Sequence, residues 1–429
     1  MFYTKPLDRI EAPESPDNPY EQGTAHFAAG QMNGRIGSQL DHYAKKAKMP
    51  RRSFVKSAAG FAAAMLAVNK SAGMRLFDVY EVEAASPEAA VENGQLTKSI
   101  TEFIVDAHTH VCWRGDGFVV GKNTTERGMY FVNDIDGLGK SRGLAGGIRD
   151  MTVENFAKLV LNGSDTSVAI VNPFGFREDY GGKDMMPIEE LVEVRNRWPK
   201  QVILLGGGLT PNQGLSETLD RLQMYVEKYK ISGLKLYTFD ATPKRGWWMD
   251  DEKVAYPLWE RCRKLGLKNI GCHKGLPFSH FAARYAHPTD FDQVAEDFSD
   301  MNWMVFHSAY PYITELASLG TAYKSHRKNL YCELGSTFAA LVSNQPLACA
   351  HTLGTLLRDM GADYVMWGTD SLLWGNPQWQ IEAFRRFQIP DELVEGYGYP
   401  RLTPELKQKI LGGNAARIWG INASAKKSG

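Results

Sequence analysis

Five side chains able to bind a metal or transfer a proton fall at the ends of short apolar runs in the sequence. The first run, residues 104–110 (IVDAHTH), carries two histidines two positions apart. Alternate residues of a strand face the same side, so His108 and His110 can present both imidazoles to one cation. Three later runs end in His273, His307 and Asp370. Histidines with one carboxylate form a common ligand set for Zn²⁺, and Mn²⁺ or Fe²⁺ are alternatives.

Eight such runs follow one another from Phe103 onward. The predicted strands are Phe103–His108, Ser167–Pro173, Gln201–Gly207, Gly233–Tyr237, Asn269–His273, Trp303–His307, Leu330–Leu334 and Tyr364–Gly368. Helical spacing between them predicts, among others, the helices Ser216–Lys228, Val254–Gly266 and Pro346–Met360. Eight strand–helix units predict an α/β fold, the (β/α)₈ TIM barrel, with a doubly wound open sheet as the alternative. In a barrel the carboxyl ends of all strands meet at one mouth, which would bring the five side chains together.

The first hundred residues do not share this pattern and predict a non-barrel extension. We divide the chain into a polar N-terminal extension at residues 1–50, a second segment at 51–85, and the barrel at 103–422. Residues 1–50 are rich in Pro, Gly, Asn and Gln without a sustained period, so we expect them to wrap on a surface or to be mobile.

The segment at 51–85 resembles a twin-arginine export signal. Arg51 and Arg52 are followed by a hydrophobic residue, by Lys56, and by the weakly apolar stretch Ser57–Val68. A small-residue cleavage site is suggested near Ala84, although about fifty residues precede the arginines, which is unusual for a signal. The pattern predicts export to the periplasm. The alternative is a buried, Ala-rich helix of a cytoplasmic protein.

The composition excludes several classes of protein. The 429 residues include 49 basic and 49 acidic side chains, so no net charge attracts a nucleic acid and we expect none as a partner. The sequence has no apolar run of the ~18–20 residues that a membrane-spanning helix needs, so we expect no integral membrane segment. Its five cysteines are scattered without a CxxC pair, which argues against a disulfide framework or a cysteine zinc site.

The motifs together carry a family resemblance over residues 103–420. They are DAHTH at 106–110, the two strand-end histidines, WGTDS at 367–371, and GGNAARIWG at 412–420. On these the chain resembles the amidohydrolase superfamily, in the amidohydrolase-2 branch that includes aminocarboxymuconate-semialdehyde decarboxylase. The resemblance implies one divalent metal, zinc before manganese or iron, with the ligands His108, His110, His273 and Asp370. It also implies that His307 is a catalytic histidine beside the metal and that Asp370 accepts a proton from the activated water.

Two further residues bear on the predicted site. Lys235, on the fourth predicted strand, corresponds to a lysine that other branches of the superfamily carboxylate to bridge two metals. An unmodified ammonium cannot bridge cations, so a second metal is expected only if Lys235 is carboxylated, and we favour one metal. Asp106 precedes the histidine pair and either supports the ligands or buttresses the strand end.

Aromatic and basic residues after the strand ends indicate the class of substrate. Their types suit a flat or cyclic molecule with a carboxylate, although loops that pack over a barrel mouth often carry the same residues. The predicted substrate-binding residues are Arg114, Trp113, Lys274, Trp248, Tyr310 and Trp374.

We therefore expect an enzyme with a small-molecule substrate. The leading hypothesis is a metal-dependent hydrolase in which activated water attacks a C–O or C–N bond. The first alternative is a metal-dependent, non-oxidative decarboxylase of an aromatic or muconate-type acid, which needs the same ligands. The second alternative is a catalytically inactive barrel that serves as a binding subunit. A homo-oligomer is left open.

Overall fold

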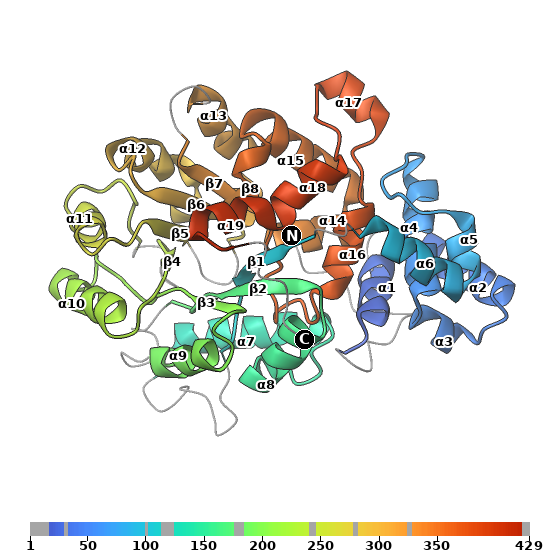
Figure 1. Cartoon of the computed structure of the whole chain (residues 1–429), viewed down its shortest axis with the longest axis horizontal. Helices are drawn as coiled ribbons and strands as arrows, with labels where there is room; N and C mark the ends of the chain where they lie inside the picture. The colour runs from blue at the N-terminus through green and yellow to red at the C-terminus, as the bar shows by residue number, and fades with distance from the viewer. Residues whose placement is uncertain are drawn as a thin grey trace.

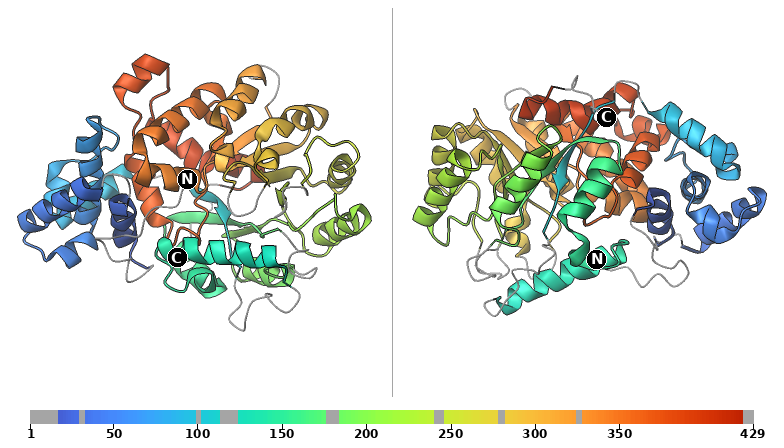
Figure 2. Two further views of the ribbon diagram at one scale, coloured as in Figure 1. Left: turned by 180° about the vertical axis from the view of Figure 1, so that it is seen from behind. Right: turned by 60° about the horizontal axis from the view of Figure 1, so that its bottom comes forward.

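The computed structural model describes residues 17–29, 33–98, 102–112, 124–175, 184–239, 246–277, 282–323 and 328–422. Its larger part is a ring of short parallel strands surrounded by helices, and a group of N-terminal helices lies at one side of this ring (Figures 1 and 2). Residues 1–16 of the predicted N-terminal extension, and the predicted substrate residues Trp113 and Arg114, fall outside the described residues.

Eight parallel strands form the ring. They are β1 (Ile104–Thr109), β2 (Thr166–Val171), β3 (Val202–Leu204), β4 (Leu234–Tyr237), β5 (Asn269–His273), β6 (Asn302–Phe306), β7 (Leu330–Glu333) and β8 (Val365–Met366). Strands β1 to β3 pair in sequence order, and so do β4 to β8. All eight predicted strands are confirmed, with ends that shift by a few residues.

Backbone contacts join the two sheets at both seams. A parallel bridge pairs Thr109 of β1 with Ser371 after β8, and the amide of Asp370 donates to the carbonyl of His108 at 2.8 Å. At the other seam, Gly206 after β3 pairs with Leu234 of β4. These bridges connect the strands into the predicted TIM barrel, and the alternative of an open sheet is wrong.

Helices follow the strands around the outside of the barrel. They are α7 (Glu126–Ser141), α8 (Val153–Phe156), α9 (Ile188–Arg197), α10 (Leu215–Glu227), α11 (Tyr256–Lys264), α12 (Phe291–Asp297), α13 (Ile313–Tyr323), α14 (Thr337–Asn344), α15 (Pro346–Asp359), α16 (Gln378–Arg386), α17 (Asp391–Tyr397), α18 (Pro404–Gln408) and α19 (Asn414–Trp419). The three predicted helices correspond to α10, α11 and α15. In α10 the residues Leu222 and Tyr225 are buried, as the helical spacing requires for the face toward the strands.

The N-terminal helices form what we call the N-terminal layer. It consists of α1 (Pro19–Ala29), α2 (Asn33–Lys46), α3 (Arg51–Val55), α4 (Ala58–Ala72), α5 (Glu81–Ala85) and α6 (Pro87–Thr97). In α1 and α2 the side chains of Phe27, Leu40 and Tyr43 are buried. The described part of residues 1–50 is therefore helical, and its scattered apolar residues pack with α4 and against the barrel helices α14 and α16.

Helix α4 contains the apolar stretch of the signal-like segment. It begins with a capping bond from the amide of Gly60 to the Ser57 hydroxyl (3.2 Å) and ends at Gly73, whose φ is 63°. Its residues 58–68 are all buried, while Arg51 and Arg52 of α3 are exposed. The prediction of export stays a prediction. Among the described helices, none combines the length and apolar character that crossing a bilayer requires.

Candidate active site

The histidine pair at the end of β1 forms the centre of the site. His108 and His110 are buried, and their Nε2 atoms lie 3.0 Å apart. The Nδ1 of His110 donates to the carbonyl of Asn172 at 2.7 Å, and the Nδ1 of His108 lies 3.1 Å from the Glu333 carboxylate. These partners accept hydrogen bonds, so the protons sit on Nδ1 and both Nε2 lone pairs face each other. Facing lone pairs repel unless a cation lies between them, and the geometry therefore fits a metal.

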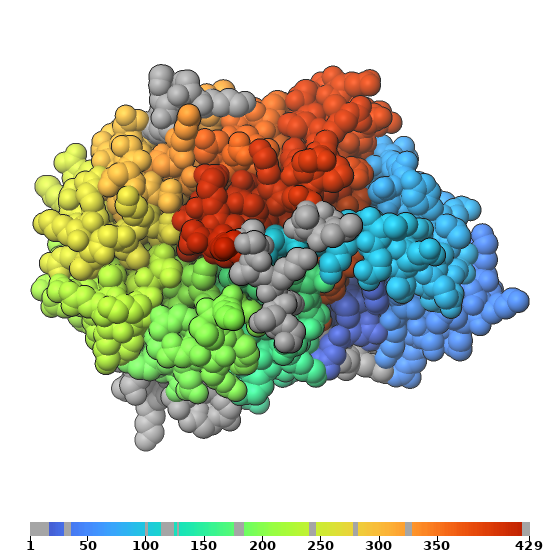
Figure 3. Space-filling model, viewed as in Figure 1, coloured from blue at the N-terminus to red at the C-terminus, as the bar shows by residue number. Residues whose placement is uncertain are grey.

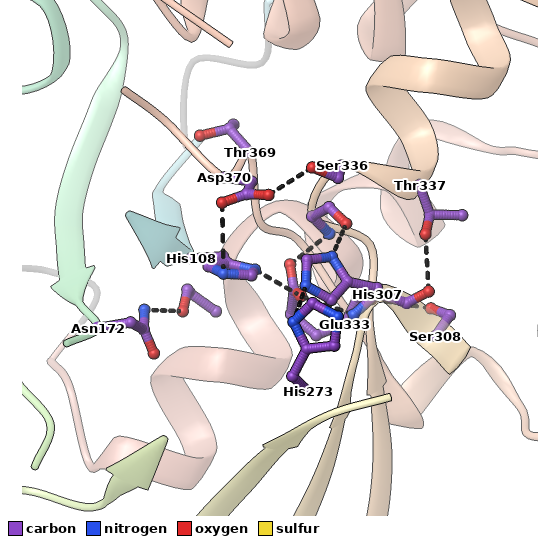
Figure 4. Close-up of polar contacts among 12 residues, drawn as sticks. His108, Asn172, His273, His307, Ser308, Glu333, Ser336, Thr337, Thr369 and Asp370 are labelled. Atoms are coloured by element: carbon purple, nitrogen blue, oxygen red, sulfur yellow. Dashed lines mark hydrogen bonds and ion pairs between the residues drawn. The ribbon is translucent and has the colours of Figure 1, made fainter. Parts of the chain in front are cut away.

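Asp370 follows β8 and joins this pair (Figure 4). Its Oδ1 lies 3.3 Å from the Nε2 of His110 and 3.5 Å from that of His108. Its Oδ2 accepts a hydrogen bond from the hydroxyl of Ser336. Burial alone would raise the pKa of Asp370, but the neighbouring imidazoles hold this pKa well below its usual value. A carboxylate in this position can bind a metal or accept a proton.

The other two histidines come from the ends of β5 and β6. The Nε2 of His307 lies 3.0 Å from the Nδ1 of His273, and the Nδ1 of His307 donates to the carbonyl of Gly335 at 2.7 Å. Burial lowers the pKa of His307 to about 3 and holds the pKa of His273 well below its ordinary value. Both rings are neutral, which is the form that binds a metal.

All five predicted residues meet in one buried cluster at the mouth of the barrel. Ligand atoms of His108, His307 and Asp370 lie within 4.8 Å of one another. This group includes His307, which the resemblance assigns to catalysis beside the metal, alongside two predicted ligands. How the ligand and catalytic roles divide among the imidazoles stays a prediction.

The backbone around the cluster is strained. His307, Asp370 and Ser336 have φ angles of 61°, 58° and 55°, in the left-handed region that non-glycine residues avoid. Ser308 and Ala309 share this conformation, with φ angles of 47° and 53°. Each such residue costs roughly 1–3 kcal/mol, and this kind of strain gathers at functional sites where the surrounding structure enforces it.

Glu333, at the end of β7, is a site residue that sequence reasoning missed. Its Oε2 faces the Nδ1 of His108 at 3.1 Å and accepts from the amide of His307 at 3.2 Å, so it holds two histidines at once. Gly368 leaves room for it, because a Cβ there would lie 1.8 Å from the Glu333 carboxylate. Burial raises the pKa of Glu333 to about 7. Glu333 could have been predicted, because a polar residue at the end of a predicted strand is the same signal that identified the other five residues.

Asp106 ties the two seam strands together. It accepts hydrogen bonds from the amides of His108 (3.1 Å) and Thr369 (3.0 Å), and from the Thr369 hydroxyl. Burial raises its pKa to about 7. It thus buttresses the ends of β1 and β8, and it orients the segments that carry His108 and Asp370.

Lys235 of β4 reaches the cluster from below the mouth. Its ammonium is buried 3.3 Å from the Nε2 of His108 and lies 3.8 Å from the centre of the Phe306 ring. Burial lowers its pKa to about 8. The structure thus brings Lys235 to the cluster of predicted metal ligands, while its carboxylation and a second metal stay predictions.

A cavity of about 190 Å³ opens from the cluster. Its described lining is mostly apolar and aromatic, and it suits a small molecule rather than a polymer. The polar members that it shares with the cluster are His110, His273, His307, Ser336 and Asp370. Its aromatic walls are Phe131, Phe174, Tyr237 and Trp374.

Arg142, at the end of α7, is the second residue that sequence reasoning missed. It lines the cavity, its guanidinium lies 3.5 Å from the centre of the Trp374 ring, and its Nη1 is buried with no hydrogen-bond partner among the described residues. Burial lowers its pKa to about 10, which leaves it charged at neutral pH. It ends a helix far in sequence from any strand end, so nothing in the sequence pattern singled it out.

The predicted substrate residues have different fates. Trp374 lines the cavity. Lys274 does not line the described cavity, because its ammonium is buried in an ion pair with Asp290 at 2.6 Å and also donates to Thr238. The prediction for Lys274 is therefore wrong.

The other predicted substrate residues are Trp248, Tyr310, Trp113 and Arg114. Trp248 packs on Tyr285 with ring centres 5.0 Å apart, outside the described lining. Tyr310 also lies outside this lining, next to Pro311, which belongs to it. The predictions for Trp248 and Tyr310 find no support in the cavity. Trp113 and Arg114 lie outside the described residues.

Comparison with known families identifies the barrel. A family model described as amidohydrolase, of the amidohydrolase-2 type, matches residues 187–421, more than half of the chain. The chain belongs to the amidohydrolase family. Enzymes of this family are metal-dependent hydrolases and decarboxylases, so the chain is an enzyme of that kind. The matched range begins after β2, and it is the structure that brings His108 and His110 to the three site residues inside the range.

Solved structures share the fold at low identity. An uncharacterized TIM-barrel protein from Bordetella bronchiseptica aligns with a TM-score of 0.51 and 17% identity, over 75% of this chain and 99% of that one. A 2,6-dihydroxybenzoate decarboxylase from Rhizobium aligns with a TM-score of 0.45 and 13% identity, over 74% and 98%. A probable 2-pyrone-4,6-dicarboxylic acid hydrolase from Acinetobacter baumannii aligns with a TM-score of 0.45 and 9% identity, over 74% and 99%. No curated protein matches the chain.

Proposed function

We propose that this amidohydrolase hydrolyses a C–O or C–N bond in a small, flat molecule that carries a carboxylate. One observation supports the proposal above the others. The carboxylate of Asp370, held among buried imidazoles, shares a small cavity with the Nη1 of Arg142, which is buried and has no hydrogen-bond partner among the described residues. The site therefore combines a base for water with a fixed positive charge for an anionic substrate.

Asp370 is the proton acceptor of the proposed reaction. A divalent metal held by these histidines and Asp370 would activate water and polarise a carbonyl. Asp370 takes the proton of the attacking water at Oδ1, while the Ser336 hydroxyl holds Oδ2 in place. The Nδ1–H of His307 donates a hydrogen bond to the carbonyl of Gly335. The Nε2 of His307 therefore acts as a ligand or proton acceptor rather than as a donor to an oxyanion.

Arg142 is the proposed anchor for the substrate carboxylate. Its guanidinium carries a charge into a mostly apolar cavity, and its Nη1 has no partner among the residues that the structure describes, so an anion that enters the cavity would satisfy it. Trp374 lies against the guanidinium and offers a flat surface to a planar ring. Arg142 is here proposed for the role that the sequence predicted for Lys274, while the predictions for Trp374 and for Arg114, which lies outside the described residues, stand as they were made.

Zinc is the proposed metal, because histidine nitrogens with one carboxylate oxygen suit it best, and manganese or iron are the alternatives. Elemental analysis of the purified full chain, followed by removal of the metal and reconstitution with each ion separately, tests this. We expect about one equivalent of metal per chain and the highest activity with zinc. Full activity restored only by manganese or iron would contradict the choice of zinc, and two equivalents would support a carboxylated Lys235.

A paired assay tests the reaction. The metal-loaded full chain is given lactones, esters and amides of small aromatic or cyclic carboxylates, for example 2-pyrone-4,6-dicarboxylate, and separately the free acids, for example 2,6-dihydroxybenzoate. We expect hydrolysis of members of the first set, seen as proton release from lactones and esters or as free amine from amides, and abolished by Asp370→Asn. Release of CO₂ from the free acids, without hydrolysis of any member of the first set, would contradict the proposed reaction.

Decarboxylation is the second candidate, and one observation favours it. Phe131, Phe174 and Tyr237 make the cavity wall apolar, and such surroundings favour the spread of negative charge from the carboxylate onto the substrate carbon as CO₂ leaves, before that carbon takes up a proton. The CO₂ arm of the assay above decides between the two reactions.

A further inference from the structure

The N-terminal layer is firmly attached to the barrel. Phe77 pairs with Phe387 in an antiparallel bridge, and the amide of Asp78 donates to the carbonyl of Arg386 at 2.6 Å. The guanidinium of Arg386 forms a buried ion pair with Glu83 at 2.5 Å. In the space-filling view the layer, in blue, abuts the C-terminal part of the barrel, in red (Figure 3). The attachment is at α16 and the residue after it, directly downstream of the loop that carries Asp370.

Helix α1 of the layer contacts this same loop, residues 367–377. The Oε1 of the fully buried Gln22 accepts a hydrogen bond from the amide of Asn376 at 3.0 Å. The loop has no room for a side chain at Gly375, whose φ is 70°, because a Cβ there would lie 2.7 Å from the Gln22 amide group. Close contact and a left-handed backbone together fix the path of the loop.

His26, one turn further along α1, contacts one tryptophan of the loop and one of α16. Its ring stacks on Trp379 with centres 4.6 Å apart, and it lies 5.4 Å from the ring of Trp374. The indole N–H of Trp374 donates to the Ser336 hydroxyl at 2.8 Å, and this hydroxyl donates to Asp370. A continuous series of contacts thus runs from α1 through the cavity wall to the proposed base.

We propose that the N-terminal layer is a permanent part of the active enzyme, in which Gln22 and His26 are positioning residues for Trp374 and, through Ser336, for Asp370. The inference concerns the shape of the cavity wall and holds for hydrolysis and for decarboxylation alike. It assigns a role to residues outside the range that matches the family model. The proposal also implies that the buried helix α4 belongs to the structural core and is not removed as an export signal.

The first test measures Trp374 itself and does not depend on catalysis. Quenching by acrylamide is recorded for the metal-loaded full chain and for the Gln22→Ala/His26→Ala double variant. Each is also recorded in a Trp374→Phe background, so that the difference reports Trp374 alone. In the wild type this residue is 3% exposed, and we expect strong protection. We expect markedly higher quenching in the double variant, and equal quenching in both proteins would overturn the proposal.

The second test separates positioning from general loss of stability. With the substrate found in the paired assay, we expect the double variant to raise KM about tenfold through Trp374 and to lower kcat severalfold through Ser336 and Asp370, with bound metal unchanged. His26→Phe keeps the stacked ring and should restore most of the loss seen in His26→Ala. The control is Phe54→Leu, at a fully buried position of α3 within the layer. It should lower the melting temperature without moving KM, and a KM shift as large as that of His26→Ala would contradict a specific role.

The third test asks whether the layer stays attached. The intact mass of the active fraction, purified from cells that express the full chain, should include residues 17–98. An active fraction that lacks residues 1–84 and has the KM of the full chain would overturn the proposal. Failure of the paired assay to find any substrate would count against the proposed function alone, because the quenching and mass measurements do not need one.

Discussion

The cluster of predicted metal ligands and the wall of the cavity are built in different ways. The cluster consists of side chains at strand ends, and its histidines are fixed by the hydrogen bonds that they donate to Glu333, Asn172 and Gly335. The wall also takes residues from a helix end and a loop, Arg142 and Trp374, and part of its support comes from α1 outside the barrel. The cluster is positioned by the core of the fold, and this part of the wall by elements attached to it.

This difference separates the chemistry from the choice of substrate. Strand ends of a packed barrel move little, so ligands there keep the geometry that a metal demands. Loops and added layers can change without unfolding the barrel, so the residues that select a substrate can differ between proteins with the same cluster. Substitutions in the cluster should therefore abolish turnover, and substitutions in the wall should mainly alter KM.

Replacement of the proposed base should have the largest effect. Asp370→Asn removes the carboxylate that faces His108 and His110 while keeping its size. We expect kcat to fall about a thousandfold and metal content to fall as well, with an unchanged far-ultraviolet circular dichroism spectrum. Turnover and elemental analysis on one preparation check this. Retained metal together with wild-type turnover would remove Asp370 from the mechanism.

Loss of the proposed anchor should be the strongest change in the wall. Arg142→Ala leaves the cavity without its buried cation, and we expect KM to rise about a hundredfold with metal unchanged. Arg142→Lys keeps the charge without the planar fork and should lie between wild type and Arg142→Ala. The matched control is Arg149→Ala at an exposed position of the following turn, which should leave KM unchanged. A large fall in kcat at constant KM would place Arg142 with the cluster instead.

Glu333→Gln tests how the cluster is supported. Glutamine has the same shape, but its neutral oxygen is a weaker partner for the Nδ1–H of His108. Partners of this kind set metal affinity by about 10–100-fold, so we expect the metal to bind roughly 30-fold more weakly. Competition against a chelator measures this affinity. An unchanged affinity would mean that Glu333 supports the fold only.

The barrel and the cluster could both be predicted from the sequence, and the reason is physical. Strand period and strand ends are local signals, and a barrel converts them into one place in space, so His108 and Asp370 could be brought together without a structure. Glu333 carried the same signal and was overlooked. The support that Asp106 gives was foreseen in outline, and its pairing with Thr369 follows from the seam between β1 and β8.

The wall could not be read from the sequence in the same way. Arg142 reaches the cavity from the end of α7, and Lys274, a better candidate by its position, is neutralised by Asp290 sixteen residues away. Which loop residue turns inward depends on ion pairs and packing that no local pattern records. The N-terminal layer shows the same limit, since its polar α1 contributes through a few buried residues such as Gln22.

The smallest expected effect concerns the acid stability of the layer. His26 has a buried Nε2 without a partner among the described residues, and burial, aided by the nearby Arg142, lowers its pKa to about 3. The unfolded chain binds a proton at His26 near pH 6.5 and the folded chain does not, so the unfolding free energy falls as the pH drops below 6.5. At pH 5.5 this costs about 1.4 kcal/mol relative to neutral pH.

His26→Phe removes this proton uptake while keeping a ring against Trp379. The variant should therefore lose less stability than the wild type between pH 7.5 and pH 5.5, by about 1.4 kcal/mol, with little difference between the two proteins at pH 7.5. Urea unfolding of both proteins at the two pH values, with the metal removed so that its release does not contribute, measures the difference. An equal loss in both proteins would mean that His26 takes up its proton in the folded state, and that α1 is less tightly packed on the cavity wall than the stacked rings indicate.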